Sequence, residues 1–529
     1  MTDAALPQYQ SGEERSQGSS SHNDEKVSPS TTDEIQVAPP GLTTGGIVTE
    51  EQYVSEAQLQ ARSGSLPFRW QSLWEPAVIN SVNGKSFTFP IFRIWDPYSI
   101  AFWLATLGFF SAFFSWFAFS PLMPEAVKSD LKLTQAQITH SNLASLGGTA
   151  IVRIFAGAAV DRFGPRKVMA FLLCLGAIPS ALVPLVSNIG HLEAVRFFIS
   201  ILGGTFVPTQ AWTTTFFDKT IVGTANAFSG GWGNMGGGVT VFVMINIFEG
   251  LRKAGLTPHL AWRICFLVLP VPLLFVVAAL MMLVGKDHPA GKWSQRHLLP
   301  GTAIAVAHAV SEPLTLKSAA AILSDLRVWM CALSYMMTFG LETALDAALP
   351  GLILTLFQSP SFGPVDAAYV ASTWGLCNLY ARPFGGILCD ILYRRFRHRG
   401  LGVRAKVIFL LATGISQGLL LVGLGIYVDH GKASLGGVIG FIVAIATVGF
   451  AANGAAYAVY GHLRPKNVGV VAGIIGSCGN VGGLWFTLIF LYQPGSKALR
   501  TLGRKFWISG IVNAALLVPF VFLPLGDAN

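Results

Sequence analysis

The chain repeats one pattern of charged and small residues at two widely separated places. Each copy reads Arg-x-x-x-Gly-x-x-x-Asp within a mostly apolar stretch. The residues are Arg153, Gly157 and Asp161 in the first copy, and Arg382, Gly386 and Asp390 in the second. A charge at the centre of a membrane helix costs ~2.5–3.5 kcal/mol on insertion scales, so an arginine kept there twice indicates a function. Guanidinium is planar with forked N–H donors, which suit a planar oxyanion.

The composition predicts that membrane helices position these arginines. The 529 residues are 52% hydrophobic and 12% charged, with a mean hydropathy of +0.54, whereas soluble domains carry about 25% charged residues. Apolar runs of about 20 residues, long enough to span a bilayer, recur from Tyr98 onward. We predict twelve spans, at about 98–120, 137–160, 168–188, 190–212, 220–248, 261–284, 328–357, 367–391, 404–428, 433–459, 468–492 and 505–525.

The repeated pattern falls in spans 2 and 8, so the architecture is read as a duplication. We predict an all-α membrane protein with two pseudosymmetric six-helix bundles, 98–284 and 328–529, joined by a cytoplasmic linker, 285–327. Before them, 1–97 is expected to hold a disordered acidic tail and an aromatic segment on the membrane surface.

Loop charges predict the orientation. With both termini inside, the cytoplasmic loops, counted with the first three residues of each adjoining span, hold 17 Lys and Arg residues, and the outer loops counted in the same way hold 10. Positive residues concentrate on the cytoplasmic side of membrane proteins. We therefore predict a multi-pass protein with both termini in the cytoplasm, and we assign the basic excess to the membrane rather than to nucleic acid.

The loop after span 2 resembles the signature of the major facilitator superfamily, Gly-x-x-x-Asp-Arg-x-Gly-x-Arg-Lys. The matching residues are Gly157, Asp161, Arg162, Gly164, Arg166 and Lys167. The resemblance implies transport by alternating access, with Asp and Arg residues pairing across the cytoplasmic face in one conformation. The residues assigned to this gate are Asp161, Arg162, Arg166, Asp390 and Arg394.

A narrower resemblance lies in spans 5 and 11. GGWGNMGGGVT (Gly230–Thr240) and GSCGNVGGLWF (Gly476–Phe486) look like the paired glycine-rich motifs of the nitrate/nitrite porter family. The stretches Arg196–Gln210 and Phe216–Asn226 are similar to fungal high-affinity members, and the resemblance covers about 95–525. It implies a nitrate transporter, with nitrite as a further substrate. We identify no catalytic constellation, metal spacing or phosphate loop, and we expect neither an enzyme nor a cofactor.

Helix geometry places the two arginines at matched depths. Arg153 lies eight residues from the cytoplasmic end of span 2, which is ~12 Å into a core whose midplane is ~15 Å deep. Arg382 lies at the same depth by the same count. We predict that both bind the anion near the midplane, where such transporters hold substrate. The alternative is that each arginine merely pairs with a buried carboxylate.

Three polar residues are further candidates for the anion site. Asn234 and Asn480 are the polar exceptions in the glycine-rich segments, whose small residues otherwise let helices pack closely. Each amide could donate to an oxyanion or bond a neighbouring helix. Tyr335 in span 7 could cap the anion with its hydroxyl group, or it could be an ordinary interior tyrosine.

Two carboxylates are candidates for carrying protons. Glu342 and Asp346 lie one helical turn apart, well inside span 7. Arginine cannot supply the proton because its guanidinium stays charged. The alternatives are a hydrogen-bonded strut or a charge in the outer vestibule. Glu193 and Arg196, near the outer end of span 4, are expected to form a local pair.

Together these features predict nitrate uptake across the plasma membrane by proton symport. The expected partners are nitrate, nitrite, protons and the lipid bilayer, and we expect a monomer that binds no nucleic acid. Two other functions stay open at this point. One is nitrate/nitrite exchange, and the other is a nitrate-sensing receptor that signals through its acidic tail.

Overall fold

The computed structural model describes residues 53–54, 69–80, 83–298, 315–464, 467–493 and 500–522. The acidic tail predicted at the N-terminus lies outside these residues, apart from two in a short strand, and so does the middle of the predicted linker. All the described residues belong to one compact unit, Gly45–Asn529.

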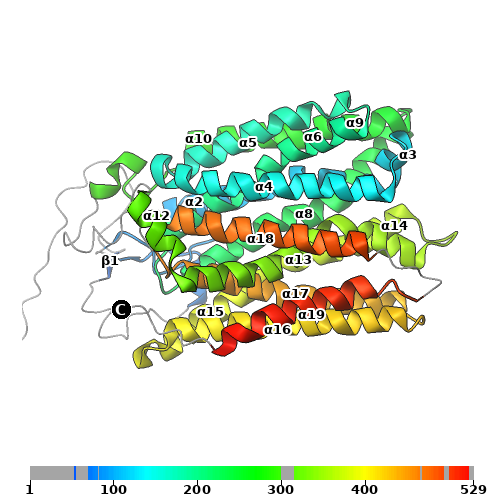
Figure 1. Ribbon diagram of the computed structural model, residues 1–529. Helices are drawn as coiled ribbons and strands as arrows, with labels where there is room; N and C mark the ends of the chain where they lie inside the picture. The colour runs from blue at the N-terminus through cyan, green and yellow to red at the C-terminus, as the bar shows by residue number, and fades with distance from the viewer. Residues whose placement is uncertain are drawn as a thin grey trace, which may run out of the picture. The chain divides into compact units, whose positions relative to one another are not determined.

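Long helices account for nearly all of this unit and confirm the all-α fold (Figure 1). Eleven helices or helix pairs in the described residues are long and apolar enough to cross a membrane. In chain order, the main helices are α2 (Pro97–Trp116), α4 (Gln135–Phe163), α5 (Pro165–Ala181), α6 (Ile189–Ile199), α7 (Phe206–Phe216), α8 (Val222–Lys253), α9 (Pro258–Val268), α10 (Pro270–Val284), α13 (Leu326–Phe357), α14 (Pro364–Leu376), α15 (Ala381–Phe396), α16 (Gly402–Asp429), α17 (Leu435–Tyr460), α18 (Val468–Tyr492) and α19 (Arg504–Leu517).

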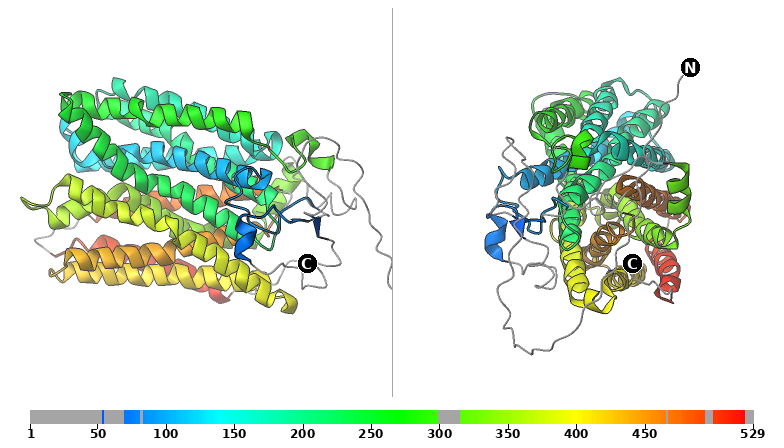
Figure 2. Two further views of the ribbon diagram at one scale, coloured as in Figure 1. Left: turned by 180° about the vertical axis from the view of Figure 1, so that it is seen from behind. Right: turned by 90° about the vertical axis from the view of Figure 1, so that its left-hand side faces the viewer.

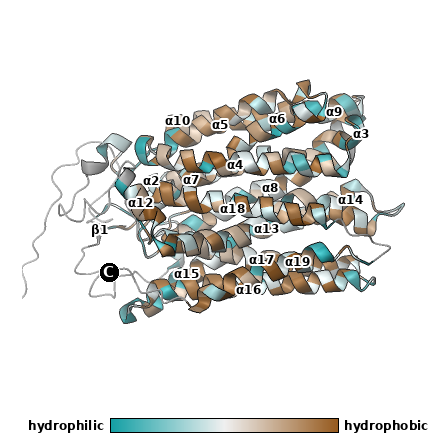
Figure 3. Cartoon of the chain, viewed as in Figure 1, coloured by the Kyte–Doolittle hydropathy of each residue, from teal (hydrophilic) through white to brown (hydrophobic). Residues whose placement is uncertain are grey.

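Short elements complete the described structure. They are the helices α3 (Lys128–Asp130) and α12 (Leu316–Leu323) and the parallel strand pair β1 (Tyr53–Val54) and β2 (Ile79–Asn80). Hydrophobic residues predominate along the helices, and hydrophilic residues are more frequent toward the helix ends (Figure 3). Large apolar side chains such as Phe155, Phe171 and Leu283 are exposed, which is the pattern of helices whose outer faces contact lipid rather than water.

The two bundles contact each other crosswise. In one contact α4 of the first bundle packs along α18 of the second, and in the other α8 of the first bundle packs against α14 and α15 of the second (Figure 1, Figure 2). Each helix that carries a repeated arginine, α4 or α15, therefore lies beside the glycine-rich helix of the opposite bundle. The duplication in the sequence thus brings the arginines and the glycine-rich segments to the same interface.

Glycines allow these helices to approach closely at both ends of the interface. A Cβ atom on Gly157 would lie 2.7 Å from the carbonyl oxygen of Gly469 in α18. A Cβ atom on Gly238 would lie 2.7 Å from the carbonyl carbon of Gly375 in α14. Both gaps are too short for a side chain, so the small residues have the packing role expected of them.

Span 8 is broken immediately before its arginine. α14 ends at Leu376, a turn of 3₁₀ helix covers Cys377–Leu379, and α15 begins at Ala381. Pro383 has no N–H group to donate to the carbonyl of Leu379 four residues earlier, and Nε1 of Trp232 in α8 donates to that carbonyl instead, at 3.0 Å. We predicted one continuous span at 367–391. The corresponding helix of the first repeat, α4, is continuous through Arg153, and the proline explains why the second repeat is broken.

Residues from both bundles also meet at the end of the helices where α2 terminates. We call it the Ser120 end, because Ser120 Oγ donates to the backbone oxygen of Asp346 in α13 at 2.9 Å. We call the opposite end the Asp161 end. There the residues before α2 pair with the chain between α7 and α8, since Ser86 N donates to Phe216 O at 2.9 Å. Phe87 in this segment is buried and Trp70 is 73% exposed, so the segment does not lie wholly on a membrane surface.

Candidate functional site

The two repeated arginines are fully buried and reach across the interface between the bundles. Arg153 Nε donates to Gly203 O at 2.9 Å, and its Nη1 donates to Gly476 O in α18 at 2.8 Å. Arg382 Nη1 donates to Gly230 O in α8 at 3.1 Å. Each arginine therefore bonds the first glycine of the glycine-rich segment in the other bundle, as the duplication predicts.

The two asparagines predicted at the site complete this symmetry. Asn234 Nδ2 donates to Gly230 O at 2.7 Å, and Asn480 Nδ2 donates to Gly476 O at 3.0 Å. Each glycine carbonyl thus accepts from an arginine of one bundle and from an asparagine of the other. Because an amide nitrogen carries two hydrogens, each asparagine keeps a second donor. Direct contact between these amides and an anion stays a prediction.

One aromatic ring lies between the two guanidinium groups. The centroid of Phe339 is 5.0 Å from Arg153 Cζ and 5.7 Å from Arg382 Cζ. Tyr335 stacks on Phe339 with centroids 4.8 Å apart, and its hydroxyl lies 2.9 Å from that of Tyr457. Tyr335 is therefore at the site, although its hydroxyl bonds a second tyrosine and its predicted contact with an anion is untested.

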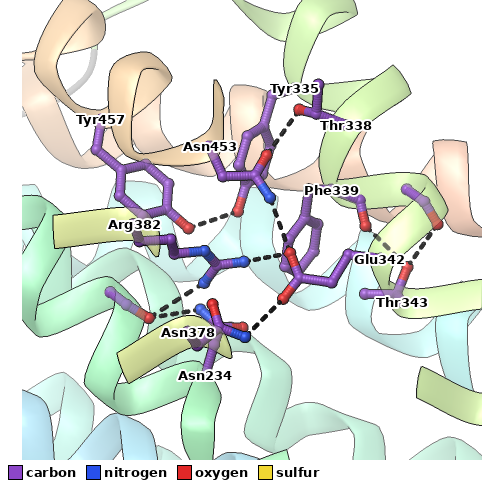
Figure 4. A network of polar contacts seen from close by, with 12 residues as sticks. Asn234, Tyr335, Thr338, Phe339, Glu342, Thr343, Asn378, Arg382, Asn453 and Tyr457 are labelled. Atoms are coloured by element: carbon purple, nitrogen blue, oxygen red, sulfur yellow. Dashed lines mark hydrogen bonds and ion pairs between the residues drawn. The ribbon is translucent and has the colours of Figure 1, made fainter. Parts of the chain in front are cut away.

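A buried carboxylate, that of Glu342, compensates Arg382 (Figure 4), and none in the described residues compensates Arg153. Arg382 Nη2 forms an ion pair with Glu342 Oε2. Two amides also donate to this carboxylate, Asn453 Nδ2 to Oε2 at 2.8 Å and Asn378 Nδ2 to Oε1 at 3.3 Å. No carboxylate in the described part of the chain forms an ion pair with Arg153. The alternative of simple pairing with a carboxylate thus holds for Arg382 and fails for Arg153.

Several buried polar atoms at the site have no hydrogen-bond partner among the described residues. The donors are Arg153 Nη2 and Arg382 Nε, and the acceptors are the Oδ1 atoms of Asn234, Asn480 and Asn378. Leaving a buried polar group unsatisfied costs about 1–3 kcal/mol, and more for a charged one. Two free guanidinium N–H groups beside one uncompensated charge are suited to bind a small anion.

Asp346, the second predicted proton carrier, lies one turn beyond Glu342 on α13. Its side chain is half-buried, on the side of Glu342 that leads to the Ser120 end. It forms no ion pair within the described structure. Glu342 is therefore bound directly to the arginine site, and Asp346 lies between that site and one end of the helices.

The aspartates of the repeated pattern cap helices of the opposite bundle. Asp161 accepts hydrogen bonds from the backbone N–H groups of Gly469 and Val470, both at 3.1 Å, in the first turn of α18. Asp390 accepts from Thr224 N at 2.6 Å in the first turn of α8. A carboxylate at a helix N-terminus is favoured by the unpaired N–H groups and by the helix dipole. These contacts join the bundles at the Asp161 end.

A buried lysine supports the second of these caps. Lys406 Nζ lies 3.0 Å from Asp390 Oδ1 and 3.0 Å from His462 Nε2. Because an ammonium group only donates, the His462 nitrogen accepts. Burial, with Lys406 close by, holds the pKa of His462 well below its ordinary value. His462 is therefore neutral in this arrangement.

The arginines assigned to the gate behave differently from the aspartates. Arg166 pairs with Asp287 of its own bundle at 3.2 Å, and burial raises the pKa of that aspartate against the opposing effect of Arg166. Arg162 and Arg394 form no ion pair within the described residues. The expected Asp–Arg pairs across the face are thus absent for these arginines, and backbone N–H groups and Lys406 contact the aspartates instead.

The predicted local pair of Glu193 and Arg196 is wrong. Arg196 Nη1 donates to Ser141 Oγ in α4 at 2.5 Å, and the described ion pairs include none between Glu193 and Arg196. The spacing of one helical turn suggested that the two side chains contact each other. Instead, α6 packs against α4, and Ser141 of α4 is the partner of Arg196.

Sequence reasoning missed several residues of the site. Phe206 lies 4.8 Å from Arg153 Cζ, and Phe339, Asn378, Asn453 and Tyr457 were also not assigned roles. The signal for two of them was available: Asn378 lies one turn before Arg382, and Asn453 is a buried amide in an otherwise apolar span. Their common target, Glu342, is far away in the sequence, so pattern alone could not connect them.

Comparison with known proteins decides the family. The profile of the Major Facilitator Superfamily matches residues 105–487. High affinity nitrate transporter 2.5 of Arabidopsis thaliana is 33% identical, over 83% of this chain and 82% of that protein. Nitrate transporter 2.1 of Chlamydomonas reinhardtii is 31% identical, over 83% and 77%.

The chain belongs to the nitrate/nitrite porter family of the major facilitator superfamily. This porter is therefore a multi-pass membrane transporter and not an enzyme. A bacterial relative, the probable nitrate/nitrite antiporter NarK1 of Thermus thermophilus, is 28% identical to the porter, over 74% of this chain and 84% of its own. Among solved structures, the proton:xylose symporter XylE superposes with a TM-score of 0.62 at 15% identity, covering 81% of the porter and 96% of XylE; this likeness concerns the fold alone.

Proposed function

We propose that this porter takes up nitrate, with nitrite as a second substrate, and that the anion binds between Arg153 and Arg382. The observation that carries the proposal is the state of Arg153. It is fully buried, forms no ion pair with any described carboxylate, and has an Nη2 group without a partner. An isolated buried cation is costly, and a monovalent oxyanion would supply both its missing charge and its missing acceptor. The nitrate transporters among the relatives support nitrate as that anion.

The charges of the site favour one anion together with one proton. Arg153, Arg382 and ionised Glu342 give a net charge of +1. Nitrate adds one negative charge, and a proton on Glu342 adds one positive charge. The loaded site then carries the same net charge as the empty one, so nitrate and a proton cross the membrane together without moving net charge.

Protonation of Glu342 would also release Arg382 for the anion. The carboxylate holds Arg382 Nη2 in the empty site, and a neutral carboxyl group holds a guanidinium far less strongly. Nitrate would then contact both arginines. Uptake against a negative interior costs ~2.3 kcal/mol per 100 mV for a single negative charge, so a co-transported proton removes this electrical barrier. We infer proton symport on this basis, with Asp346 as an intermediate carrier from the Ser120 end.

Alternating access would use the contacts between the bundles. We place the Asp161 end in the cytoplasm and the Ser120 end outside, in keeping with the distribution of basic loops, with both termini cytoplasmic and the protein in the plasma membrane. The caps made by Asp161 and Asp390 would then close the cytoplasmic side, and the contact of Ser120 with Asp346 would close the outer side. We take the monomer as the transporting unit.

Uptake of labelled nitrate by the purified full chain in lipid vesicles tests the proposal. Arg153→Gln removes the uncompensated charge, and we expect uptake to fall to the level of vesicles without protein. Arg263→Lys is the control, because Arg263 is a buried arginine that pairs with Asp130 at 2.7 Å, away from the site. Uptake by Arg153→Gln close to that of the control would overturn the anion site.

Nitrate/nitrite exchange is a second candidate, favoured by the bacterial relative named as a probable antiporter. An exchanger needs anion on both sides of the membrane, whereas a symporter needs a proton gradient. Vesicles preloaded with nitrite at equal pH on both sides separate the two. Two results together would establish exchange and contradict symport. Nitrate would enter the nitrite-loaded vesicles rapidly at equal pH, and it would not accumulate in vesicles that have only an inward proton gradient.

A further inference from the structure

The two amides that hold Glu342 differ in one respect. Asn453 donates through Nδ2 to Glu342, and its Oδ1 accepts from Thr338 Oγ1 at 2.6 Å. Both ends of this amide are therefore engaged, which fixes its orientation. Asn378 also donates through Nδ2 to Glu342, but its Oδ1 is buried and has no partner in the described structure. The orientation of Asn378 is therefore set by Glu342 alone.

The protonation state of Glu342 changes what it needs from these neighbours. An ionised carboxylate only accepts hydrogen bonds, whereas a protonated carboxyl group carries an O–H donor that needs an acceptor. Arg382 has no acceptor atom, and the Asn453 oxygen already accepts from Thr338. Of the three side chains that contact the carboxylate, only Asn378 has an acceptor oxygen without any hydrogen bond in the described structure.

We propose that Asn378 is a proton-linked positioning residue for Glu342. It donates to the ionised carboxylate, and when a proton carried by Asp346 is transferred to Glu342 Oε1, its amide turns by half a rotation so that Oδ1 accepts the new O–H. Asn378 thereby stabilises the acid form at the moment when Arg382 turns to the anion. This inference rests on the proposed proton coupling, and it identifies Asn378 as the group that stabilises protonated Glu342.

The place of Asn378 in the fold permits this rotation. It lies in the 3₁₀ turn between α14 and α15, one turn before Arg382. At the matching position of the first repeat, Thr149 donates to Ser200 O at 2.7 Å, inside the unbroken α4. Only the second repeat has both the broken helix and the amide, and only the second repeat has an arginine paired with a carboxylate.

Other charged and titratable groups around Glu342 also affect its titration. They are Arg382 from α15, Tyr457 from α17 and Asp346 on the same helix, α13. None of them is altered by a substitution at Asn378 or Asn453. A comparison of these two positions therefore holds the charges constant and changes only a hydrogen-bonding amide.

The direction of a pH shift distinguishes the proposal from a purely structural role. The measurement is the nitrate dissociation constant of the purified full chain as a function of pH, from which a midpoint is read. In Asn378→Leu the acid form of Glu342 loses its acceptor, whereas the ionised form loses only a long hydrogen bond of 3.3 Å and keeps its two closer donors, Arg382 and Asn453. We expect the midpoint to fall by about one pH unit, the size of one unsatisfied buried donor.

Asn453→Leu is the matched control, because Asn453 contacts Glu342 only as a donor while its oxygen accepts from Thr338. Its loss weakens the ionised form, so the midpoint should rise. Asn378→Ser, whose hydroxyl can donate or accept, should return the midpoint toward that of the wild type. A midpoint that rises or stays unchanged in Asn378→Leu would overturn the proposal.

Glu342→Gln separates this inference from the proton coupling on which it rests. If the wild type and Glu342→Gln share one pH profile, Glu342 does not titrate with nitrate binding, and both ideas are wrong. If Glu342→Gln removes the midpoint but Asn378→Leu does not lower it, only the role of Asn378 is wrong. Infrared difference spectra give a second test that needs no transport. The O–H stretch of protonated Glu342 should move to higher frequency in Asn378→Leu, as for a carboxyl O–H without an acceptor, and should move little in Asn453→Leu, which removes a donor to the other oxygen.

Discussion

At the scale of single residues, the two arginines are alike in position and unlike in charge balance. The sequence predicted their shared depth because both lie eight residues before an aspartate. It did not predict that Glu342 pairs with Arg382 alone, since that depends on how α13 and α15 pack. In the proposed mechanism this asymmetry gives the two arginines different roles: Arg153 would carry the charge that attracts the anion, and Arg382 would exchange a carboxylate for the anion.

Lysine substitutions should reveal these separate duties. Lysine keeps the charge but loses the planar fork. At pH values where Glu342 is ionised, Arg153→Lys should weaken nitrate binding by about 10–100-fold, the loss of a charge-assisted hydrogen bond, and Arg382→Lys should weaken it less. At acid pH the two losses should become similar, because Arg382 is then also free to bind. Calorimetric titration over a range of pH measures this, and equal losses at every pH would count against the assigned duties.

At the scale of elements, the repeated aspartates are helix caps that join the bundles. The sequence motif indicated a gate but suggested Asp–Arg pairs, whereas Asp161 bonds the N-terminus of α18. A helix N-terminus is not visible in a charge pattern, which explains the error. The break in span 8 was also missed, although Pro383 directly follows Arg382 and is the signal for it. The helix limits elsewhere follow from the apolar runs, since length and hydropathy alone define a membrane span.

Removing one cap should loosen the Asp161 end. Asp161→Asn keeps the size of the side chain but removes the charge that the N-terminus of α18 favours, at a cost of about 0.3–2 kcal/mol. We expect a cysteine placed at Ala458, which is buried beside that end, to react faster with a soluble thiol reagent in a background without the six native cysteines. Nitrate affinity at the arginine site should change little. Unchanged labelling would show that this cap does not hold the interface closed.

At the scale of the whole molecule, the two bundles meet on crossed helix pairs with close glycine contacts toward both ends. Gly157 of α4 approaches Gly469 near the Asp161 end, and Gly238 of α8 approaches Gly375 nearer the Ser120 end. Because the arginine site lies between these contacts, opening either one would expose it to a different side. The twofold repeat in the sequence anticipated two bundles and a central site, but not which glycines touch.

Alanine at each contact should open the molecule in opposite directions. A Cβ atom on Gly157 meets backbone at 2.7 Å, so Gly157→Ala should increase labelling of the cysteine at Ala458. A Cβ atom on Gly238 also meets backbone at 2.7 Å, so Gly238→Ala should decrease the labelling of this cysteine. Gly147→Ala in α4 and Gly250→Ala in α8 are controls, because a Cβ atom at either glycine has no atom within 4 Å. If cysteine labelling changed in the same direction in Gly157→Ala and Gly238→Ala, that result would contradict alternating access about these contacts.

The central claim is that nitrate and a proton bind together, the anion at the arginines and the proton at Glu342. Calorimetry of nitrate binding in buffers of different ionisation enthalpy counts the protons taken up with each anion. Between the pH at which Glu342 titrates in the empty porter and the higher pH at which it titrates in the nitrate-bound porter, linkage predicts about one proton per nitrate for the wild type. It predicts none for Glu342→Gln, which should still bind nitrate. A wild type that takes up no proton, or a Glu342→Gln variant that takes up as many as the wild type, would contradict the claim.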